Sequence, residues 1–170
     1  GYNYRLTEIQ AAIAIEQLKK LEFINKLRIE YVEYLNHCLK DIEFLEVING
    51  RDECESTFYT YPLLYRPEIT GINIENFTNI INSEGFYFYR GYKPLYYQPI
   101  YQTRTAFKFG YPFSAQENKE IVTNYNEGAC PMAESLYDSL LINEHIRLPN
   151  TMEDMKDIVE VFKKFEGFVK

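Results

Sequence analysis

The sequence predicts an α/β protein, more closely an α+β sandwich, in which a long N-terminal helix precedes a small sheet with helices packed on one face. A helical pattern runs from about Thr7 to Leu39 without a glycine or proline. The remainder alternates β-branched or aromatic runs with amphipathic runs, and 46% of all residues are hydrophobic, enough for a core. We therefore expect two parts, residues 1–45 as a long connecting or dimer helix and residues 46–170 as a small α/β domain.

Apolar side chains in the first helix recur mostly three or four residues apart, the spacing of one helical face. Thr7 precedes Gln10 by three residues, so the two can form a capping box at the helix start. A helix that continues to Leu39 is roughly 50 Å long, given a rise of about 1.5 Å per residue. Because a small domain does not cover such a rod, we expect it to bridge domains or to pack against a partner.

The next elements are a strand, a helix and a second strand. Residues 57–65 are β-branched and aromatic, which predicts a strand, and Pro62 indicates an edge position or a bulge within it. Asn73 is a favourable N-cap for a short amphipathic helix, and Gly85 is suited to end it. The aromatic run at residues 86–90 predicts the second strand.

The second half of the chain begins with an irregular segment, because glycine and proline interrupt residues 91–130 repeatedly. Pro131 suits the first turn of a helix that we expect to reach about residue 141. Residues 145–148 are predicted to form a strand closed by a proline. Thr151 opens the last helix, in which apolar residues form a stripe on one face.

Composition and charge exclude several classes of function. The net charge is −7, the pI is about 5.0, and Lys and Arg form no block, so we expect no nucleic-acid partner. Since no run approaches the ~20 apolar residues of a membrane span and no signal peptide is recognisable, we expect no membrane partner. Cys38, Cys54 and Cys130 contain no C-x-x-C pair, which indicates reduced thiols in the cytoplasm. His37 and His145 lack the ligand spacing of a metal site.

Four segments resemble, in the same order, the motifs of a known family. Residues Gly1–Leu21 contain G-x-N-x-R, Q-A-A and Q-L-x-x-L, and Tyr92–Tyr101 is similar to Y-x-P-L-H-x-Q-P-x-Y. Cys130–Glu134 matches C-P-x-A-E, and Ile146–Pro149 resembles a closing strand. Together they resemble the C-terminal domain of DegT/DnrJ/StrS-type pyridoxal-phosphate-dependent aminotransferases, which make amino sugars and aminocyclitols. The resemblance implies the small C-terminal domain of a fold-type I aminotransferase.

The resemblance also implies transfer of an amino group through pyridoxal 5'-phosphate. In the family, the Schiff-base lysine and the carboxylate that pairs with the pyridine nitrogen precede the segment that matches Gly1. Lys93 lies instead in a tyrosine-rich loop, and Lys19 and Lys20 lie on the long helix. Because the chain starts at Gly1 without an initiator methionine, we expect a fragment that holds no catalytic residue and is inactive alone.

Two residues near the N-terminus are the candidate cofactor ligands. In the family, this stretch reaches the phosphate of the cofactor in the partner subunit of a homodimer, and the resemblance places that role on Asn3 and Arg5. An amide donates one hydrogen bond to a phosphate oxygen, and a guanidinium makes a bidentate, charge-assisted contact. The alternatives are a turn residue before the helix for Asn3 and a structural ion pair for Arg5.

The tyrosine-rich loop is the candidate wall for the substrate. Tyr92, Tyr96, Tyr97 and Gln98 combine flat apolar faces with hydroxyl and amide groups, which suits a sugar ring. For any single tyrosine, ordinary aromatic packing against the sheet is the favoured alternative, and the excess of 16 Tyr in the chain also fits the bias of an AT-rich genome. Tyr96 stands where the family often has histidine, which leaves the identity of the substrate open.

Three functions fit these observations. The first is an aminotransferase that aminates a keto-sugar, nucleotide-linked or otherwise, with glutamate or glutamine as the amino donor. The second is a sugar dehydratase of the same family, in which histidine replaces the Schiff-base lysine. The third is a binding or dimerisation module without catalysis. The residue that separates the first two lies outside this sequence.

Overall fold

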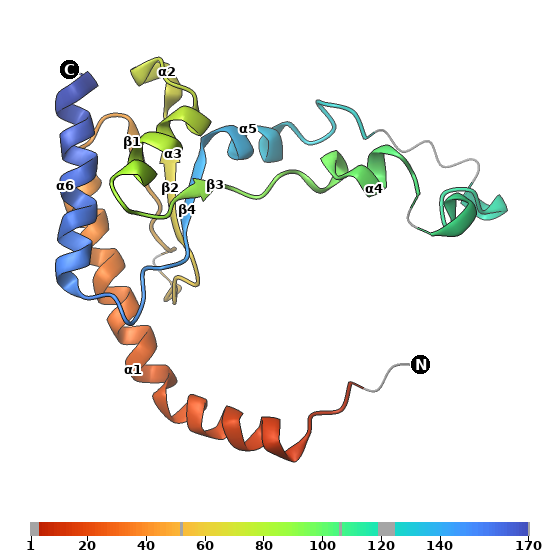
Figure 1. Cartoon of the computed structure of the whole chain (residues 1–170), viewed down its shortest axis with the longest axis horizontal. Helices are drawn as coiled ribbons and strands as arrows, with labels where there is room; N and C mark the ends of the chain where they lie inside the picture. Colours follow the sequence, from red (N-terminus) through yellow and green to blue (C-terminus); the bar gives the residue numbers. More distant parts are fainter. Residues whose placement is uncertain (1–3, 52, 106, 119–124, 170) are drawn as a thin grey trace.

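The computed structural model describes residues 4–51, 53–105, 107–118 and 125–169 (Figure 1). This part of the chain contains a four-stranded antiparallel sheet with the order β1-β2-β4-β3. The strands are β1 (Leu45–Val47), β2 (Tyr61–Tyr65), β3 (Tyr89–Arg90) and β4 (Leu140–Asn143). The α-helices are α1 (Glu8–Leu39), α2 (Pro67–Thr70), α3 (Ile74–Ser83), α4 (Pro99–Gln102), α5 (Pro131–Ser139) and α6 (Met152–Val169). The same described ranges hold the short 3-10 helices η1 (Leu95–Tyr97), η2 (Lys108–Gly110) and η3 (Gln116–Asn118).

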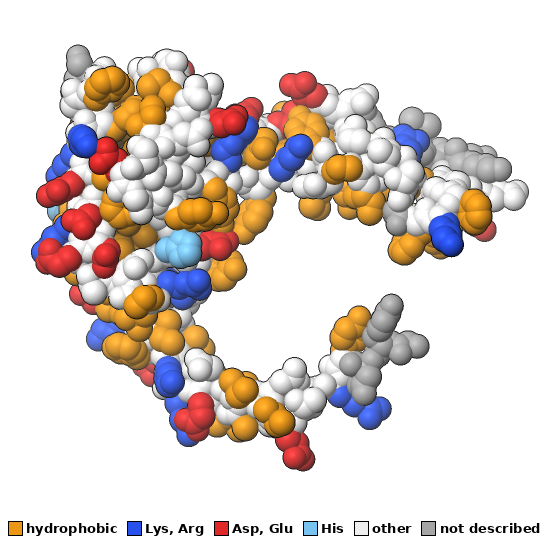
Figure 2. All heavy atoms as spheres, in the orientation of Figure 1, with side chains coloured by type: hydrophobic (Ala, Val, Ile, Leu, Met, Phe, Trp, Pro, Cys, Tyr) orange, Lys and Arg blue, Asp and Glu red, His pale blue; other side chains and the backbone are white. Residues whose placement is uncertain are grey.

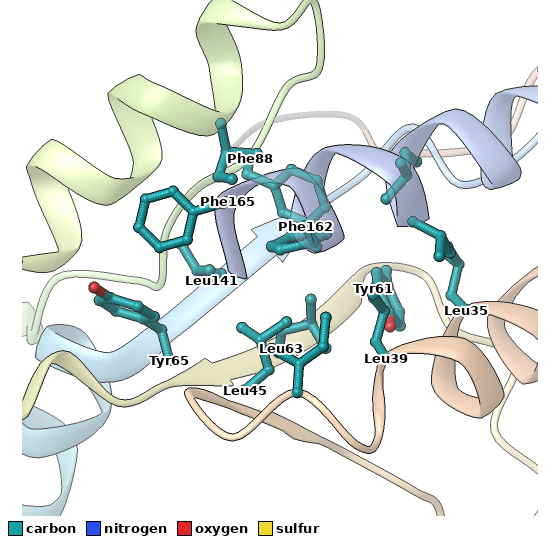
Figure 3. Packing of buried hydrophobic residues seen from close by; sticks show 14 of the residues in the cluster. Leu35, Leu39, Leu45, Tyr61, Leu63, Tyr65, Phe88, Leu141, Phe162 and Phe165 are labelled. Atoms are coloured by element: carbon teal, nitrogen blue, oxygen red, sulfur yellow. The ribbon is translucent and has the colours of Figure 1, made fainter. Parts of the chain in front are cut away.

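The hydrophobic core lies between one face of the sheet and helices α1, α3 and α6 (Figure 3). Alternation along β2 directs Tyr61, Leu63 and Tyr65 to this face, and all three are buried. Phe77 of α3 stacks on Tyr65 with ring centroids 4.0 Å apart, and Phe165 of α6 meets the Phe77 ring edge-on at 4.9 Å. The predicted fold class, a long helix followed by a small sheet covered by helices, is confirmed.

Helix α1 divides into an exposed first half and a buried second half. Its first turn is the predicted capping box: Thr7 Oγ1 accepts from Gln10 N at 3.3 Å, and Gln10 Oε1 accepts from Thr7 N at 2.9 Å. Leu35 and Leu39 are buried in the core, whereas Ile9 is 76% exposed. Figure 1 shows the helix curving so that its first half projects away from the sheet. Because this half leaves the small domain, its apolar residues lack cover from that domain.

Other local signals are confirmed as well. Asn73 Oδ1 accepts from Asn76 N at 2.8 Å and caps α3, and Gly85 follows the helix with φ of 98°. Pro131 occupies the first turn of α5. Pro62 is the exception: predicted at an edge or a bulge, it lies in the internal strand β2 and pairs in regular register with Ile142 of β4, beyond the three residues that β1 covers. Thr151 immediately precedes α6, and its N–H donates to Asp154 Oδ2 at 2.6 Å.

The strand predicted at residues 145–148 is wrong. The strand is β4, which begins directly where α5 ends, so α5 stops at Ser139 rather than near residue 141. The apolar residues of β4 pair with β2 on one side and with β3 on the other, which favours a strand over a further helical turn. Residues 145–148 turn instead, because Asn143 Oδ1 accepts from His145 N at 2.7 Å and Arg147 N donates to His145 O at 2.7 Å.

Two further differences concern strand length and number. Strand β1 was not predicted, since its three residues follow the long helix after a short turn. Strand β2 begins at Tyr61 rather than at residue 57, because Phe58 adopts φ of 45° and interrupts an extended backbone. Strand β3 covers only Tyr89–Arg90 of the predicted 86–90 run.

Residues 91–130 are here called the arm, and their described part is irregular as predicted. Their described part contains η1, α4, η2 and η3, and Figure 1 shows it projecting from the sheet between β3 and α5. Gly91 begins the arm: its N–H donates to Leu140 O at 2.6 Å and continues the pairing of β3 with β4. None of the described helices is both long and apolar enough to cross a bilayer.

Candidate functional site

The two candidate cofactor ligands lie at or beyond the start of the described chain. Asn3 falls outside the described residues. Arg5 is exposed and lies just before the first turn of α1. Figures 1 and 2 show the N-terminal segment and the arm projecting toward the same side of the small domain while remaining apart. Arg5 thus precedes α1, whereas the candidate tyrosines lie on the arm, a separate segment of the chain.

The four candidate substrate residues lie at the base of the arm. Tyr92 is 70% exposed, Tyr96 and Tyr97 are half-buried in η1, and Gln98 is exposed at the N-cap of α4. The rings of Tyr96 and Tyr97 meet edge-on, with centroids 4.8 Å apart. The structure thus brings Tyr96 and Tyr97 into direct contact, and Pro94 and Pro99 flank them in the chain. We call this pair of rings the tyrosine wall.

A carboxylate from a distant segment fixes the tyrosine wall. The hydroxyl of Tyr96 donates to Glu134 Oε1 in the first turn of α5, which is 38 residues further along the chain. The N–H of Gly128 donates to both carboxylate oxygens of Glu134, at 2.8 and 3.0 Å. Glu134 therefore joins the start of the arm, its last residues and α5. Residue patterns placed Glu134 only within the C-P-x-A-E match, and did not assign it to the site.

The protonation states of this group follow from its contacts. The hydrogen bond from Tyr96, together with the Gly128 N–H, holds the pKa of Glu134 below its usual value against partial desolvation. Desolvation, and then the hydrogen bond to Glu134, raise the pKa of the Tyr96 phenol. Near neutral pH the carboxylate is therefore ionised and the phenol is protonated.

Gln102 anchors the arm behind the wall. Its Nε2 donates to Tyr96 O at 2.6 Å and to Tyr125 O at 2.8 Å, so it joins the two ends of the arm. By contrast, the backbone carbonyl of Gln98 accepts from Tyr101 N and Gln102 N, and starts α4. The sequence match singled out Gln98, whereas Gln102 is the amide that organises the loop.

A second tyrosine–carboxylate pair lies where the arm meets the sheet. The hydroxyl of Tyr89 in β3 donates to Glu144 Oε1 at 2.5 Å, just beyond the end of β4. Partial burial, then this hydrogen bond, raise the pKa of Tyr89, and the neighbouring Tyr92 adds to the effect. Tyr92 thus lies beside Tyr89, and neither Tyr89 nor Glu144 was predicted as a site residue.

The described residues fit only part of a pyridoxal-phosphate site. The exposed guanidinium of Arg5 suits a phosphate. Covalent attachment needs a lysine activated by burial or by neighbouring charge, and every lysine in the described ranges is exposed. These residues therefore suit a phosphate contact and a substrate wall, and they do not suit the covalent anchor of the cofactor.

Comparison with known proteins places the chain in a family. Residues 1–123 match the DegT/DnrJ/EryC1/StrS aminotransferase family, and the chain belongs to it. It is 30% identical over 166 residues to L-glutamine:2-deoxy-scyllo-inosose aminotransferase of Streptomyces kanamyceticus, covering 96% of this chain and 38% of that protein. It is 30% identical over 102 residues to UDP-4-amino-4,6-dideoxy-N-acetyl-beta-L-altrosamine transaminase of Campylobacter jejuni, covering 60% of this chain and 27% of that protein.

The solved structures agree on the fold. PseC of Helicobacter pylori, an aminotransferase involved in the biosynthesis of pseudoaminic acid, superposes with a TM-score of 0.75 at 21% identity. That superposition covers 99% of this chain and 39% of PseC. The chain thus spans about two-fifths of the length of the proteins that it matches over its whole extent. The predicted resemblance to the C-terminal domain of this family is confirmed.

Proposed function

We propose that this chain forms the C-terminal part of a pyridoxal-phosphate-dependent aminotransferase that aminates the carbonyl of a keto-sugar, such as a nucleotide-linked sugar, or of a keto-cyclitol. One observation carries the proposal: the similarity to a glutamine-dependent aminotransferase extends over 96% of the chain, and the family match over residues 1–123 includes Arg5 and the base of the arm. The amino sugar produced would enter polysaccharide or antibiotic biosynthesis in the cytoplasm.

In this proposal the N-terminal segment serves the cofactor of a partner subunit. When bound, pyridoxal phosphate supplies the electron sink for amino transfer. Arg5 and Asn3 bind the phosphate, and the charge-assisted contact of Arg5 orients the ring. The exposed position of Arg5, on a segment that projects from the domain, supports a contact with a second copy in a homodimer. The lysine that binds the cofactor covalently lies outside these 170 residues.

The arm serves the substrate in the same proposal. Tyr92, Tyr96 and Tyr97 present ring faces to the apolar side of a six-membered polyhydroxy ring, and Gln98 presents an amide to its hydroxyls. The amino donor is L-glutamate or L-glutamine. Since these residues are exposed or half-buried at the base of the arm, a bound ring reaches them without rearrangement of the core.

The test uses the complete protein reconstituted with pyridoxal phosphate. L-Glutamine or L-glutamate should abolish the visible absorbance band of the bound cofactor, and 2-deoxy-scyllo-inosose or a UDP-4-keto-sugar should restore it while an amino product forms. Loss of water from the sugar without an amino product would identify a dehydratase. A protein without any cofactor band would be a binding module, and would contradict the proposal.

Arg5→Gln tests the assigned cofactor contact. Loss of a charge-assisted hydrogen bond of about 1.5–3 kcal/mol should weaken pyridoxal-phosphate affinity by about 10–100-fold. The matched control is Arg51→Gln, an exposed arginine in the loop between β1 and β2, which should leave the affinity unchanged. Equal affinity of the Arg5 variant and the wild type would remove Arg5 from the site.

A further inference from the structure

The hydroxyl of Tyr96 has only acceptor capacity left for a ligand. A phenol carries one proton and two acceptor lone pairs, and the proton of Tyr96 is donated to Glu134 Oε1. The carboxylate cannot return a proton, because it remains ionised with its two oxygens also accepting from Gly128 N. A ligand that approaches the Tyr96 oxygen must therefore bring the hydrogen itself.

The negative charge of Glu134 also favours a ligand group that carries hydrogen or positive charge. Among the described residues, no lysine or arginine forms an ion pair with Glu134. Desolvation, and then the charges of Glu134 and Glu127, raise the pKa of the neighbouring Tyr97, so carboxylates act on the second ring of the wall as well. Lys93 already places its ammonium 5.9 Å from the centroid of the Tyr97 ring, so this aromatic face accepts a cation.

We propose that Glu134 is a positioning residue that fixes Tyr96 as an acceptor and makes the tyrosine wall select ligand groups that carry hydrogen, above all an amine, over carboxylates and other anions. The inference rests on the proposed function, because an amine at this wall is the group that an aminotransferase adds to its ring substrate. The wall would accordingly bind the amino or hydroxyl edge of the sugar or cyclitol, with any anionic portion directed away from Glu134.

The test measures the binding of three ring probes to the complete protein without cofactor, by titration in saturation-transfer NMR. The probes are 2-deoxystreptamine, which carries amines, myo-inositol, which is neutral, and D-glucuronate, which carries a carboxylate. The wild type should bind 2-deoxystreptamine about tenfold more tightly than D-glucuronate, the ratio expected of one charge-assisted hydrogen bond. Myo-inositol should fall between them.

Variants separate the effect of the Glu134 charge from its effect on the position of Tyr96. Glu134→Gln keeps an acceptor for Tyr96 and Gly128 but removes the charge, so its thermal stability should be retained while the preference for the amine falls to about threefold or less. Tyr96→Phe should lower the preference similarly, because it removes the acceptor and keeps the ring. Glu127→Gln removes a nearby charge that makes no hydrogen bond to Tyr96, and should leave most of the preference intact.

Each alternative result overturns the inference. The inference requires that Glu134 determines which probes the tyrosine wall prefers. It is contradicted if the wild type binds D-glucuronate as tightly as 2-deoxystreptamine, if Glu134→Gln keeps the preference for the amine, or if no probe binds. D-Glucuronate binding that disappears in Lys93→Gln would assign the selectivity to Lys93 instead. Because the probes need no cofactor, a protein that completes the L-glutamine half-reaction but shows no preference refutes this inference alone, whereas a missing half-reaction refutes the proposed function.

Discussion

The small domain and the two segments that project from it use large apolar side chains in opposite ways. Phe77 in α3 is fully buried among the rings of the core, whereas Phe109 in the arm is 96% exposed. The first half of α1 likewise exposes Ile9 and Ile13. The domain thus has a core of its own, and the projecting segments hold apolar surface of the kind that marks contact with further protein or ligand.

The largest expected effect is loss of the central ring of the core. Phe77→Ala removes the partner that stacks on Tyr65 and meets Phe44 edge-on at 5.9 Å, and leaves a cavity. We expect the free energy of unfolding to fall by about 3–5 kcal/mol in urea denaturation. Phe109→Ala is the control from the arm and should change it by less than about 0.5 kcal/mol. Similar losses in the two variants would contradict the contrast between core and arm.

The second prediction concerns the junction between the two regions. A Cβ added at Gly91 would lie 2.9 Å from Leu140 Cδ2 and 3.0 Å from its Cβ, closer than carbon atoms pack. Gly91→Ala should therefore lower the free energy of unfolding by about 1–3 kcal/mol. At Gly50 an added Cβ has 3.4 Å to Cys54 O, and Gly50→Ala should be close to neutral. If Gly91→Ala left the free energy of unfolding unchanged, the close approach of Gly91 to Leu140 would not be needed to join β4 and the arm.

Loss of the buried hydrogen bond between β2 and α1 should lower the free energy of unfolding by a smaller amount. Tyr61 Oη donates to Asn36 Oδ1 at 3.0 Å, and Asn36 Nδ2 donates to Asn49 Oδ1 at 3.1 Å. Tyr61→Phe leaves the Asn36 oxygen without this donor in a buried position, and should destabilise the chain by about 1–2 kcal/mol. Tyr59→Phe, at an exposed neighbour, is the control for loss of a hydroxyl. Equal unfolding curves for the two variants would remove the Tyr61–Asn36 pair from the stabilising contacts.

The elements that could be predicted are those determined by neighbours in the sequence. The capping box at Thr7, the cap at Asn73 and the helix start at Pro131 each depend on residues within one turn, and all three are confirmed. Strand β4 was misplaced because its stability comes from β2 and β3, which are remote in the chain. The pattern of residues within such a strand does not show where the preceding helix ends.

The candidate site shows the same limit. The segment that contains Tyr96 and Tyr97 became a candidate because a motif match covers it, and its role in a site stays a prediction. The contacts that organise it were not predicted, because Glu134 reaches Tyr96 across 38 residues and Gln102 reaches Tyr125 across 23 residues. Side chains that position a loop in this way have no characteristic spacing, so only the folded chain reveals them.

The smallest expected effect separates the projecting half of α1 from the core. Thr7→Ala removes a helix cap worth about 1 kcal/mol, but no buried residue lies on the first half of the helix. Amides of the first turns should exchange faster with deuterium while the melting temperature of the domain stays unchanged. Asn73→Ala removes an equivalent cap from α3, which carries Phe77 into the core, and should lower the melting temperature. If Thr7→Ala lowers it as much as Asn73→Ala, the two halves of α1 unfold together, and the first half draws its stability from the same core.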